Sequence, residues 1–192
     1  MRERGILKNP DDEKRRKWQN PEAILAGIGV KPGLTFLDIG CGSGFFTIPA
    51  AKLVGNKGKV YGLDIDSEAI ARITRKADSE GLRNIYLEIG KAEELVLCQA
   101  CADIVFFGID LHDFADPAKV LANARTMLKP NGRLVDLDWK KEPMDFGPPF
   151  RIRFSETEAA QLIEAAGFKI ESVEDNGRYH YLIIARPLPS KT

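Results

Sequence analysis

The chain has 192 residues, of which 44% are hydrophobic and 29% charged, and its 28 basic and 28 acidic side chains balance to a formal charge of zero. This length predicts one domain with modest additions and a core large enough to fold without a disulfide or a structural metal, and the composition excludes disordered and fibrous classes. The balanced charge argues against a protein that binds nucleic acid or an anionic membrane through excess positive charge.

The beginning of the chain is rich in charge. No apolar run approaches the length of about 20 residues that spans a bilayer, and Met1 to Gly5 leads into charged residues instead of the apolar core of a signal peptide. We therefore expect a cytoplasmic chain without a membrane span.

Residues 1–30 are expected to form an N-terminal helical arm, ahead of an α/β domain over residues 31–192. The charged run Asp11 to Lys17 precedes Trp18. Asn20 and Pro21 then have the residue types of a helix N-cap and first helical position, and Gly27 to Gly29 ends this short helix.

From Leu34 onward, short apolar runs alternate with longer amphipathic ones, which is typical of a parallel sheet with crossover helices. The last two apolar runs are joined by the turn Asp175 to Gly177, which is so short that these strands must be antiparallel neighbours. The prediction is an α/β fold with a seven-stranded, mostly parallel sheet, one antiparallel strand and helices on both faces. The expected strands are Thr35 to Ile39, Lys59 to Leu63, Ile85 to Ile89, Asp103 to Phe107, Arg133 to Leu137, Phe168 to Glu174 and His180 to Arg186.

The helices between these strands have readable ends. Capping residues, prolines and glycines mark where they begin and stop. The expected helices are Phe45 to Val54, Ser67 to Glu80 behind Asp66, a helix opened by Asp116-Pro117 and ended by Lys129 to Gly132, and one that begins with the capping box Ser155 to Glu158 and closes at Gly167.

The strongest motif directly follows the first strand and reads Asp38-Ile39-Gly40-Cys41-Gly42-Ser43-Gly44. Glycines let the backbone turn tightly and let a ligand approach the main chain. The third glycine comes one residue earlier than in the GxGxxG dinucleotide fingerprint, and an aspartate stands two residues before the first. A tight turn without a ligand is the alternative interpretation.

Asp64 ends the second strand about twenty residues past the glycines, where a nucleoside-binding unit holds ribose hydroxyls. A carboxylate there accepts both hydroxyl hydrogens. Asp66 is the competing candidate, but its place just before Ser67 and Glu68 indicates helix capping.

These residues resemble the class I S-adenosylmethionine-dependent methyltransferases, in particular their small-molecule and quinone-type branch. The resemblance covers the chain from Trp18 to the C-terminus. It implies a Rossmann-like fold and transfer of a methyl group from S-adenosylmethionine, with S-adenosylhomocysteine as product, to a small-molecule acceptor. The motifs that carry it are Asp38 to Gly44, Gly62 to Asp66, Gly90 to Leu95, Ala102 to Val105 with Leu111 to Asp113, and Leu128 to Leu134.

The resemblance also implies roles for individual residues. The glycine loop, with Gly40, Cys41, Gly42 and Gly44, would line the methionine part of the cofactor, and Asp38 would fix this loop or reach the amino group through water. Asp64 would hold the ribose. Ile65 would pack on the adenine, Ala92 and Glu93 would touch its edge, and the main chain at Gly108 and Ile109 would face the methionine and the sulfonium.

One position departs from the family pattern. Many relatives have an acid where Lys91 stands. Because a lysine cannot accept a hydrogen bond, a contact to the adenine amino group would pass to the backbone or to Glu93.

Asp110 and His112 follow the fourth strand, on the side where open parallel sheets bind ligands. Methyl transfer needs a general base only when the nucleophile carries a proton of high pKa. The two side chains are therefore candidates for acceptor orientation or proton removal, and capping and packing of their loop is the equally weighted alternative.

Two apolar features could cover the acceptor. Met144 to Phe150 is a proline-rich segment after the fifth strand, in which Phe146 is the candidate contact, and a rigid surface turn is its alternative. Trp18 to Ile28 would fold over the cofactor cleft with Trp18 against donor or acceptor, or else pack on the edge of the sheet.

The three cysteines, Cys41, Cys98 and Cys101, are too few for a disulfide framework, and the odd count is typical of a reducing compartment. Cys98 and Cys101 form a single CxxC pair without the second pair or the spaced histidines of a zinc site. We expect ordinary small side chains there, no metal, and no arsenite-type thiophilic substrate.

Other functions stay open at this point. A nicotinamide-dependent oxidoreductase is disfavoured by the early third glycine, and a non-catalytic S-adenosylmethionine-binding module is not distinguished by motifs alone. A nucleic-acid substrate is disfavoured, because the chain lacks both the Asn/Asp-Pro-Pro-Tyr/Phe signature and an arginine-aromatic tract. A homo-oligomer stays open.

Overall fold

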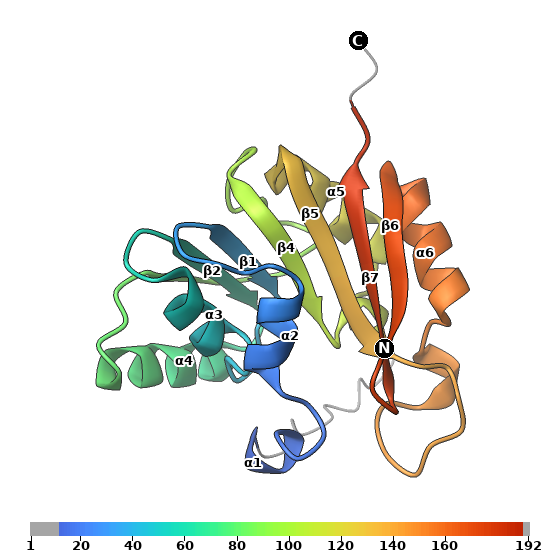
Figure 1. The fold of residues 1–192 in the computed structure, drawn as a ribbon, viewed down its shortest axis with the longest axis horizontal. Coiled ribbons are helices and arrows are strands. Elements are labelled where there is room, and N and C mark those ends of the chain that lie inside the picture. Colours follow the sequence, from blue (N-terminus) through green and yellow to red (C-terminus); the bar gives the residue numbers. More distant parts are fainter. Residues whose placement is uncertain (1–11, 190–192) are drawn as a thin grey trace.

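The computed structural model describes residues 12–189. One sheet of seven strands runs through the molecule in the order β3-β2-β1-β4-β5-β7-β6 (Figure 1). All neighbouring pairs are parallel except those of β7, which is antiparallel to both β5 and β6. The predicted α/β fold with a single reversed strand is therefore confirmed.

The strands lie close to the predicted positions. Their bounds are Thr35–Ile39 for β1, Lys59–Asp64 for β2, Ile85–Ile89 for β3, Ala102–Gly108 for β4, Leu128–Trp139 for β5, Phe168–Asn176 for β6 and His180–Pro187 for β7. β5 is longer than expected because residues Leu128 to Arg133 pair with β4 across a register shift. The predicted end of the preceding helix at residues 129–132 is therefore wrong, because α5 ends at Met127 and these residues lie inside β5.

The helices begin at their predicted caps. The side chains of Asn20, Asp66, Asp116 and Ser155 each accept a hydrogen bond from a first-turn backbone N–H. The capping box of Ser155 and Glu158 is present. The helices are α1 Asp12–Arg15, α2 Pro21–Gly27, α3 Thr47–Val54, α4 Ser67–Ser79, α5 Pro117–Met127 and α6 Glu156–Ala165, with 3-10 turns η1 Leu111–Asp113 and η2 Phe150–Ile152.

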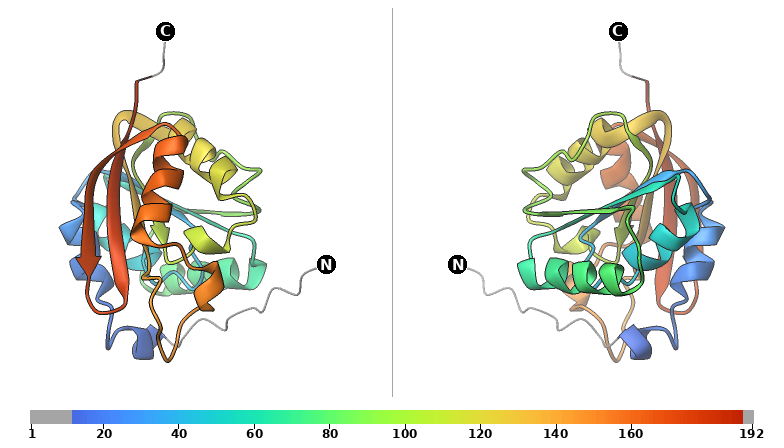
Figure 2. Two further views of the ribbon diagram at one scale, coloured as in Figure 1. Left: turned by 90° about the vertical axis from the view of Figure 1, so that its right-hand side faces the viewer. Right: turned by 90° about the vertical axis from the view of Figure 1, so that its left-hand side faces the viewer.

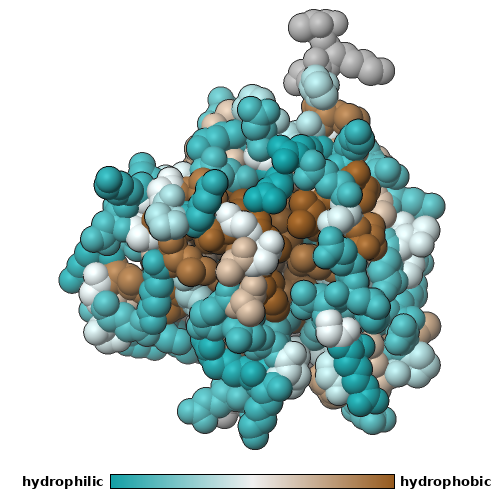
Figure 3. All heavy atoms as spheres, viewed as in Figure 1, coloured by the Kyte–Doolittle hydropathy of each residue, from teal (hydrophilic) through white to brown (hydrophobic). Residues whose placement is uncertain are grey.

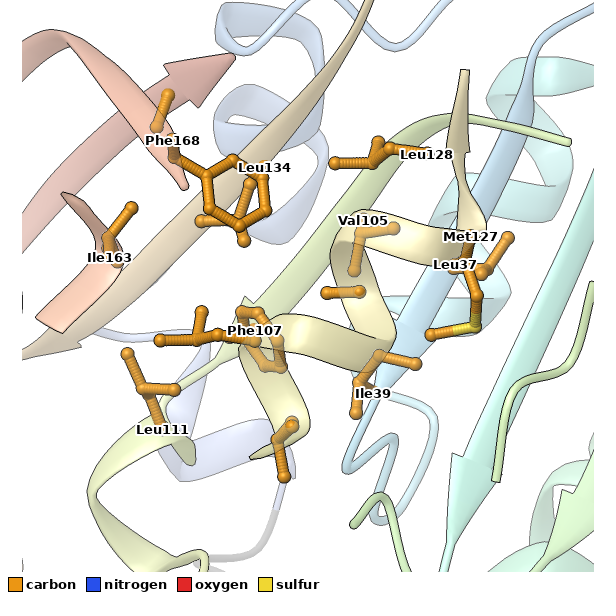
Figure 4. Packing of buried hydrophobic residues seen from close by; sticks show 14 of the residues in the cluster. Leu37, Ile39, Val105, Phe107, Leu111, Met127, Leu128, Leu134, Ile163 and Phe168 are labelled. Carbon is orange, nitrogen blue, oxygen red and sulfur yellow. The ribbon is translucent and has the colours of Figure 1, made fainter. Parts of the chain in front are cut away.

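Helices cover both faces of the sheet (Figure 2). α5 and α6 pack on one face around Phe107, Leu134 and Phe168 (Figure 4), and α2 and α3 pack on the other around Phe36, Phe106 and Val135. α4 joins α3 on that second face. Apolar side chains gather in the middle of the second face, beside α2 (Figure 3). Within residues 12–189, no helix combines the length and the apolar character that crossing a membrane requires.

The CxxC pair differs from its prediction. Cys98 and Cys101 form a disulfide in the connection between β3 and β4. Next to it, the N–H groups of Ala100 and Cys101 donate to the carbonyls of Thr126 and Met127 at the end of α5. The expectation of two ordinary small side chains was wrong, because the spacing of the pair did not reveal that this turn folds both sulfurs against each other.

Candidate active site

The glycine loop joins the end of β1 to α3. Gly40, Gly42 and Gly44 all have positive φ, at 74°, 51° and 81°. The N–H groups of Gly40 and Cys41 both donate to the carbonyl of Leu63 at the end of β2, at 2.8 and 3.0 Å. A Cβ at Gly40 would collide with Oδ2 of Asp110, so only glycine fits beside this acid. The loop is thereby pressed against the carboxyl ends of β2 and β4.

Asp64 ties this loop to β2. Its Oδ2 accepts a hydrogen bond from the Gly42 N–H at 2.7 Å, and its Oδ1 accepts from the Asp66 N–H at 2.9 Å. Asp66 is the N-cap of α4, as predicted. Ile65, between the two acids, is 58% exposed, and an apolar side chain so exposed at this edge can still pack on a ligand.

Asp38 is buried behind the loop. Its Oδ2 accepts a hydrogen bond from the Thr47 hydroxyl at 2.6 Å, which ties β1 to the first turn of α3. Burial raises the pKa of Asp38 to about 7, although the bond from Thr47 acts in the opposite direction. Of the two predicted roles, the structure contains the contact that fixes the loop.

The chain after β4 is strained and carries an unpartnered acid. Ile109 has a φ of 75°, which is rare for a β-branched residue, and its N–H donates to the carbonyl of Leu137 at 2.7 Å. Neither oxygen of the buried Asp110 carboxyl has a hydrogen-bond partner among the described residues. Burial, together with the negative charges of Asp38 and Asp138, raises the pKa of Asp110 well above its usual range.

His112 is buried two residues further on. Its Nδ1 lies 2.7 and 2.9 Å from the two carboxyl oxygens of Asp138, near the end of β5. Its Nε2 lies 3.5 Å from Oδ1 of Asp113. The structure therefore joins one predicted residue, His112, to an acid that the sequence analysis did not select.

The residues that were predicted to contact the adenine edge make other contacts within the protein. Ala92 is buried and its carbonyl accepts from the Asn123 side chain at 2.8 Å. Glu93 Oε1 accepts from the N–H groups of Ala115 and Asp116 at 3.0 and 3.4 Å. Glu93 therefore holds the loop before α5, a contact that competes with its predicted role, and Lys91 pairs with Glu94 at 3.1 Å.

The N-terminal arm lies against the glycine loop. Asp12 in α1 accepts a hydrogen bond from the Ser43 hydroxyl at 2.9 Å. The Arg15 guanidinium carbon lies 4.1 Å from the centroid of the Phe45 ring, and its Nη2 has no hydrogen-bond partner among residues 12–189. Burial lowers the pKa of Arg15 to about 10, against the charges of Asp12, Asp38 and Asp110. Residues 1–11 of the predicted arm lie outside the described residues.

Trp18 joins this arm to residues at the end of β5 and the start of β7. We use the name aromatic cluster for Trp18, Trp139, Phe146, Tyr179 and His180. The Trp18 ring lies 5.7 Å from Trp139, 5.8 Å from Phe146 and 5.3 Å from His180, between ring centroids. Two residues predicted separately as covers, Trp18 and Phe146, are thus in direct contact.

The segment between β5 and η2 is held by one arginine. Arg153 donates hydrogen bonds to the carbonyls of Lys140, Glu142, Phe146 and Pro148, at 2.8 to 3.2 Å. This segment and Arg153 line a surface cavity of about 420 Å³. The alternative prediction of a rigid surface turn is consistent with these hydrogen bonds, but the segment also contributes Phe146 to the aromatic cluster.

Sequence reasoning missed Arg15, Asp138 and Arg153. Asp136 and Asp138 did carry a signal, since two acids alternate within the apolar run Arg133 to Trp139. Arg15 carried none, because it stands in a charged run. The structure also buries the thiol of Cys41 beside Gly62, and within the described residues no group of three or more metal-ligating side chains comes together.

Comparison with known proteins gives consistent matches. The family described as "Methyltransferase domain" matches residues 30–179. A SAM-dependent methyltransferase from Aquifex aeolicus is 32% identical over 91% of this chain and 97% of its own, with a TM-score of 0.84. A demethylmenaquinone methyltransferase from Bacillus mycoides is 35% identical over 69% of this chain, and a 37.1 kDa transposon protein from Streptomyces fradiae is 34% identical over 64%. This chain spans 55% and 36% of the length of these last two relatives.

Proposed function

Because the chain belongs to the class I S-adenosylmethionine-dependent methyltransferases, we propose that it transfers a methyl group from S-adenosylmethionine to a small-molecule acceptor. The observation that carries the proposal is the Asp64–glycine loop contact, with the orphaned polar atoms of Arg15 and Asp110 beside it. The family assignment removes the support for a nicotinamide-dependent oxidoreductase. A non-catalytic binding module remains the alternative.

The residues present fit S-adenosylmethionine. Its methionine end carries a carboxylate and an ammonium, and the two orphaned buried groups at the glycine loop, Arg15 Nη2 and the Asp110 carboxyl, have the matching donor and acceptor chemistry. Gly40, Gly42 and Gly44, with Cys41 between them, would line the methionine part of the cofactor.

The protein also offers hydrogen-bond acceptors to the nucleoside end of the cofactor. Both Asp64 oxygens already accept one backbone N–H, and each retains a lone pair for a ribose hydroxyl. Ile65 would pack on the adenine and Ala92 would close its edge. Gly108 and Ile109 would present their main chain to the sulfonium side.

S-adenosylmethionine supplies, when bound, an electrophilic methyl group on a sulfonium that leaves as a neutral thioether. The chain's task is to orient donor and acceptor, an effect worth about 7 to 11 kcal/mol for well-placed reactants. In our proposal the described part of the arm, residues 12–30, closes over the donor, and Trp18 and Phe146 exclude water on the acceptor side of the domain that follows. Asp110 and His112 face the reacting groups.

The acceptor in this proposal is a small, flat, apolar molecule of the quinol type. The printed function of the Bacillus relative supports it, and so does the apolar character of the aromatic cluster. A cytoplasmic location and the absence of a nucleic-acid partner belong to the same proposal.

Binding and turnover test it separately. Titration calorimetry should show binding of S-adenosylhomocysteine and none of NAD. Methyl transfer from labelled S-adenosylmethionine to reduced 1,4-naphthoquinone should then release S-adenosylhomocysteine. Binding without transfer to any acceptor in a metabolite extract would favour the non-catalytic module, and tight NAD binding alone would contradict the proposal.

A further inference from the structure

A buried acid and an imidazole meet behind the acceptor side of the site. Asp138 accepts hydrogen bonds from the backbone N–H of Trp139 at 2.7 Å and of His112 at 3.3 Å, and its two oxygens lie 2.7 and 2.9 Å from Nδ1 of His112. The side chains of His112 and Asp138 are 2% and 1% exposed. This geometry holds the imidazole ring from one side and assigns the ring proton to Nδ1, because a carboxylate with this set of donors is an acceptor.

The other ring nitrogen has a different neighbour. Nε2 of His112 lies 3.5 Å from Oδ1 of Asp113; the His112 side chain is 2% exposed and that of Asp113 is 55% exposed. The other charges that act on the ring are Asp138 from β5 and Arg153 from the end of η2. Asp136, on the same face of β5, and Asp110, two residues earlier in the chain, are the further acids around Asp138.

We propose that His112 removes a proton from an acceptor hydroxyl that is conjugated to an aromatic or enolic system, and that Asp138 is the positioning residue that holds His112 in the required tautomer. This inference rests on the proposed methyltransferase function and narrows its acceptor class. An acceptor that is already ionised, such as a thiolate, has no need of the dyad.

The step balances as follows. The acceptor O–H bond breaks and its proton passes to Nε2 of His112, giving an imidazolium between Asp138 and Asp113. The acceptor oxygen forms the bond to the methyl carbon, the carbon–sulfur bond breaks, and its electron pair stays on the sulfur of S-adenosylhomocysteine. The proton on Nε2 then leaves to solvent, so no oxidant or reductant is needed.

Histidine NMR tests the tautomer without any acceptor. The chain has 2 histidines, so the ring signals of His112 and His180 are readily distinguished. With S-adenosylhomocysteine bound, His112 should be the Nδ1–H tautomer, and Asp138→Asn should convert it to the Nε2–H tautomer, because an amide N–H₂ turned toward the ring donates where the carboxylate accepted. Asp136→Asn is the matched control on the same strand face and should leave the tautomer unchanged.

The pH dependence gives the second readout. Burial alone lowers the pKa of His112, but the charge and hydrogen bond of Asp138, with Asp113, outweigh it, so the pKa is raised above its usual value. A base must be neutral, so kcat/KM should fall as pH decreases through this raised pKa. Asp138→Asn should move that limb to lower pH and reduce kcat for reduced 1,4-naphthoquinone by about 100-fold or more.

A thiol acceptor separates proton removal from a general structural defect. Transfer to 4-nitrothiophenol, which is a thiolate at neutral pH, should be reduced far less by Asp138→Asn than transfer to the hydroquinone. Equal losses with both acceptors, or His112 as the Nε2–H tautomer in the unmodified protein, would overturn the inference. If S-adenosylhomocysteine does not bind the unmodified protein, the proposed function itself fails, and this outcome is distinct from equal losses with the two acceptors.

Discussion

The two halves of the candidate site differ in how their polar groups are satisfied. In the cofactor half, built from β1, the glycine loop and β2, Asp38 and Asp64 already accept hydrogen bonds from Thr47, Gly42 and Asp66. In the acceptor half, at the ends of β4, β5 and β7, the described residues provide no hydrogen-bond partner for buried atoms of Asp136, His180 and Tyr181. Beside the glycine loop, the two groups proposed to bind the methionine end, Asp110 and Arg15 Nη2, also lack a partner among the described residues.

This difference indicates two ways of building one site. The cofactor half is preorganised, because its acids are used to hold backbone N–H groups in place before any ligand arrives. The acceptor half keeps buried polar groups at a cost in stability, and such groups with displaced pKa values are typical of sites that perform chemistry. Burial lowers the pKa of His180 to about 3, and it raises the pKa of Tyr181.

The largest expected effect is in the cofactor half, at Gly40. Gly40→Ala should reduce S-adenosylhomocysteine affinity by about 100-fold or more, since the new Cβ collides with Asp110 and the φ of 74° disfavours any side chain. Gly33→Ala is the matched control, because Gly33 also has a positive φ, of 87°, but open space around its Cβ position. Calorimetry on both variants should separate the collision from the backbone strain; equal affinities for the two would contradict this account of the loop.

Asp64→Ala should weaken S-adenosylhomocysteine binding by about 10- to 100-fold. A hydrogen bond to a charged group is worth about 1.5 to 3 kcal/mol, and the substitution also releases the N–H of Gly42. Asp66→Ala is the control and should cost about 1 kcal/mol of stability through its helix cap, with little change in affinity. Native circular dichroism with unchanged affinity in Asp64→Ala would show that this acid does not hold the ribose.

Asp38 makes the ligand-free protein sensitive to pH. Its native pKa of about 7 lies above the ordinary 3.8, so the native state holds a proton that the unfolded state has lost, and stability falls as pH rises through this interval. Asp38→Asn keeps an acceptor for Thr47 but has no carboxyl group to titrate. Its free energy of unfolding, relative to that of the wild type, should therefore rise by roughly 2 to 4 kcal/mol between pH 4 and pH 8. Urea unfolding at both pH values measures it, and parallel pH curves for the two proteins would show that Asp38 is not the titrating group.

In the acceptor half, Arg153→Ala should lower the free energy of unfolding by about 2 kcal/mol, because four backbone carbonyls lose their donor. Affinity for S-adenosylhomocysteine should stay unchanged, while KM for the acceptor rises. Arg151→Ala, at an exposed neighbouring position, is the control. A loss of cofactor affinity in Arg153→Ala would show that the two halves are not separable in this way.

The smallest effect is expected where the arm joins the two halves. Proteolysis at Lys14 to Lys17 should slow a few-fold with S-adenosylhomocysteine, because Arg15 gains a charged partner only in the filled site. Trp18 fluorescence should change as well, measured in a Trp139→Phe background so that Trp18 is the only tryptophan. Equal cleavage rates with and without ligand would leave the arm with a packing role on the glycine loop.

The sequence by itself determined most of the fold and the positions of the glycine loop and Asp64 within it. Strand positions, helix caps and the reversed strand depend on local patterns, such as the short apolar run around Phe36 and the capping box at Ser155, and these act over a few residues. The glycine loop and Asp64 could likewise be identified from spacing, since parallel strands bring their carboxyl ends to one edge of the sheet.

Only the tertiary structure decided the acceptor half and several contacts outside it. Several contacts depend on how segments of the chain turn toward one another. They are the pairing of His112 with Asp138, the position of Arg15 over Phe45, the contact of Trp18 with Phe146, the Cys98–Cys101 disulfide and the hydrogen bonds that Glu93 accepts from backbone N–H groups. Residues 12–18 and residues 136–153 are far apart in the chain, and no periodicity relates them. Their contacts follow from packing on a twisted sheet, which fixes positions that sequence spacing leaves free.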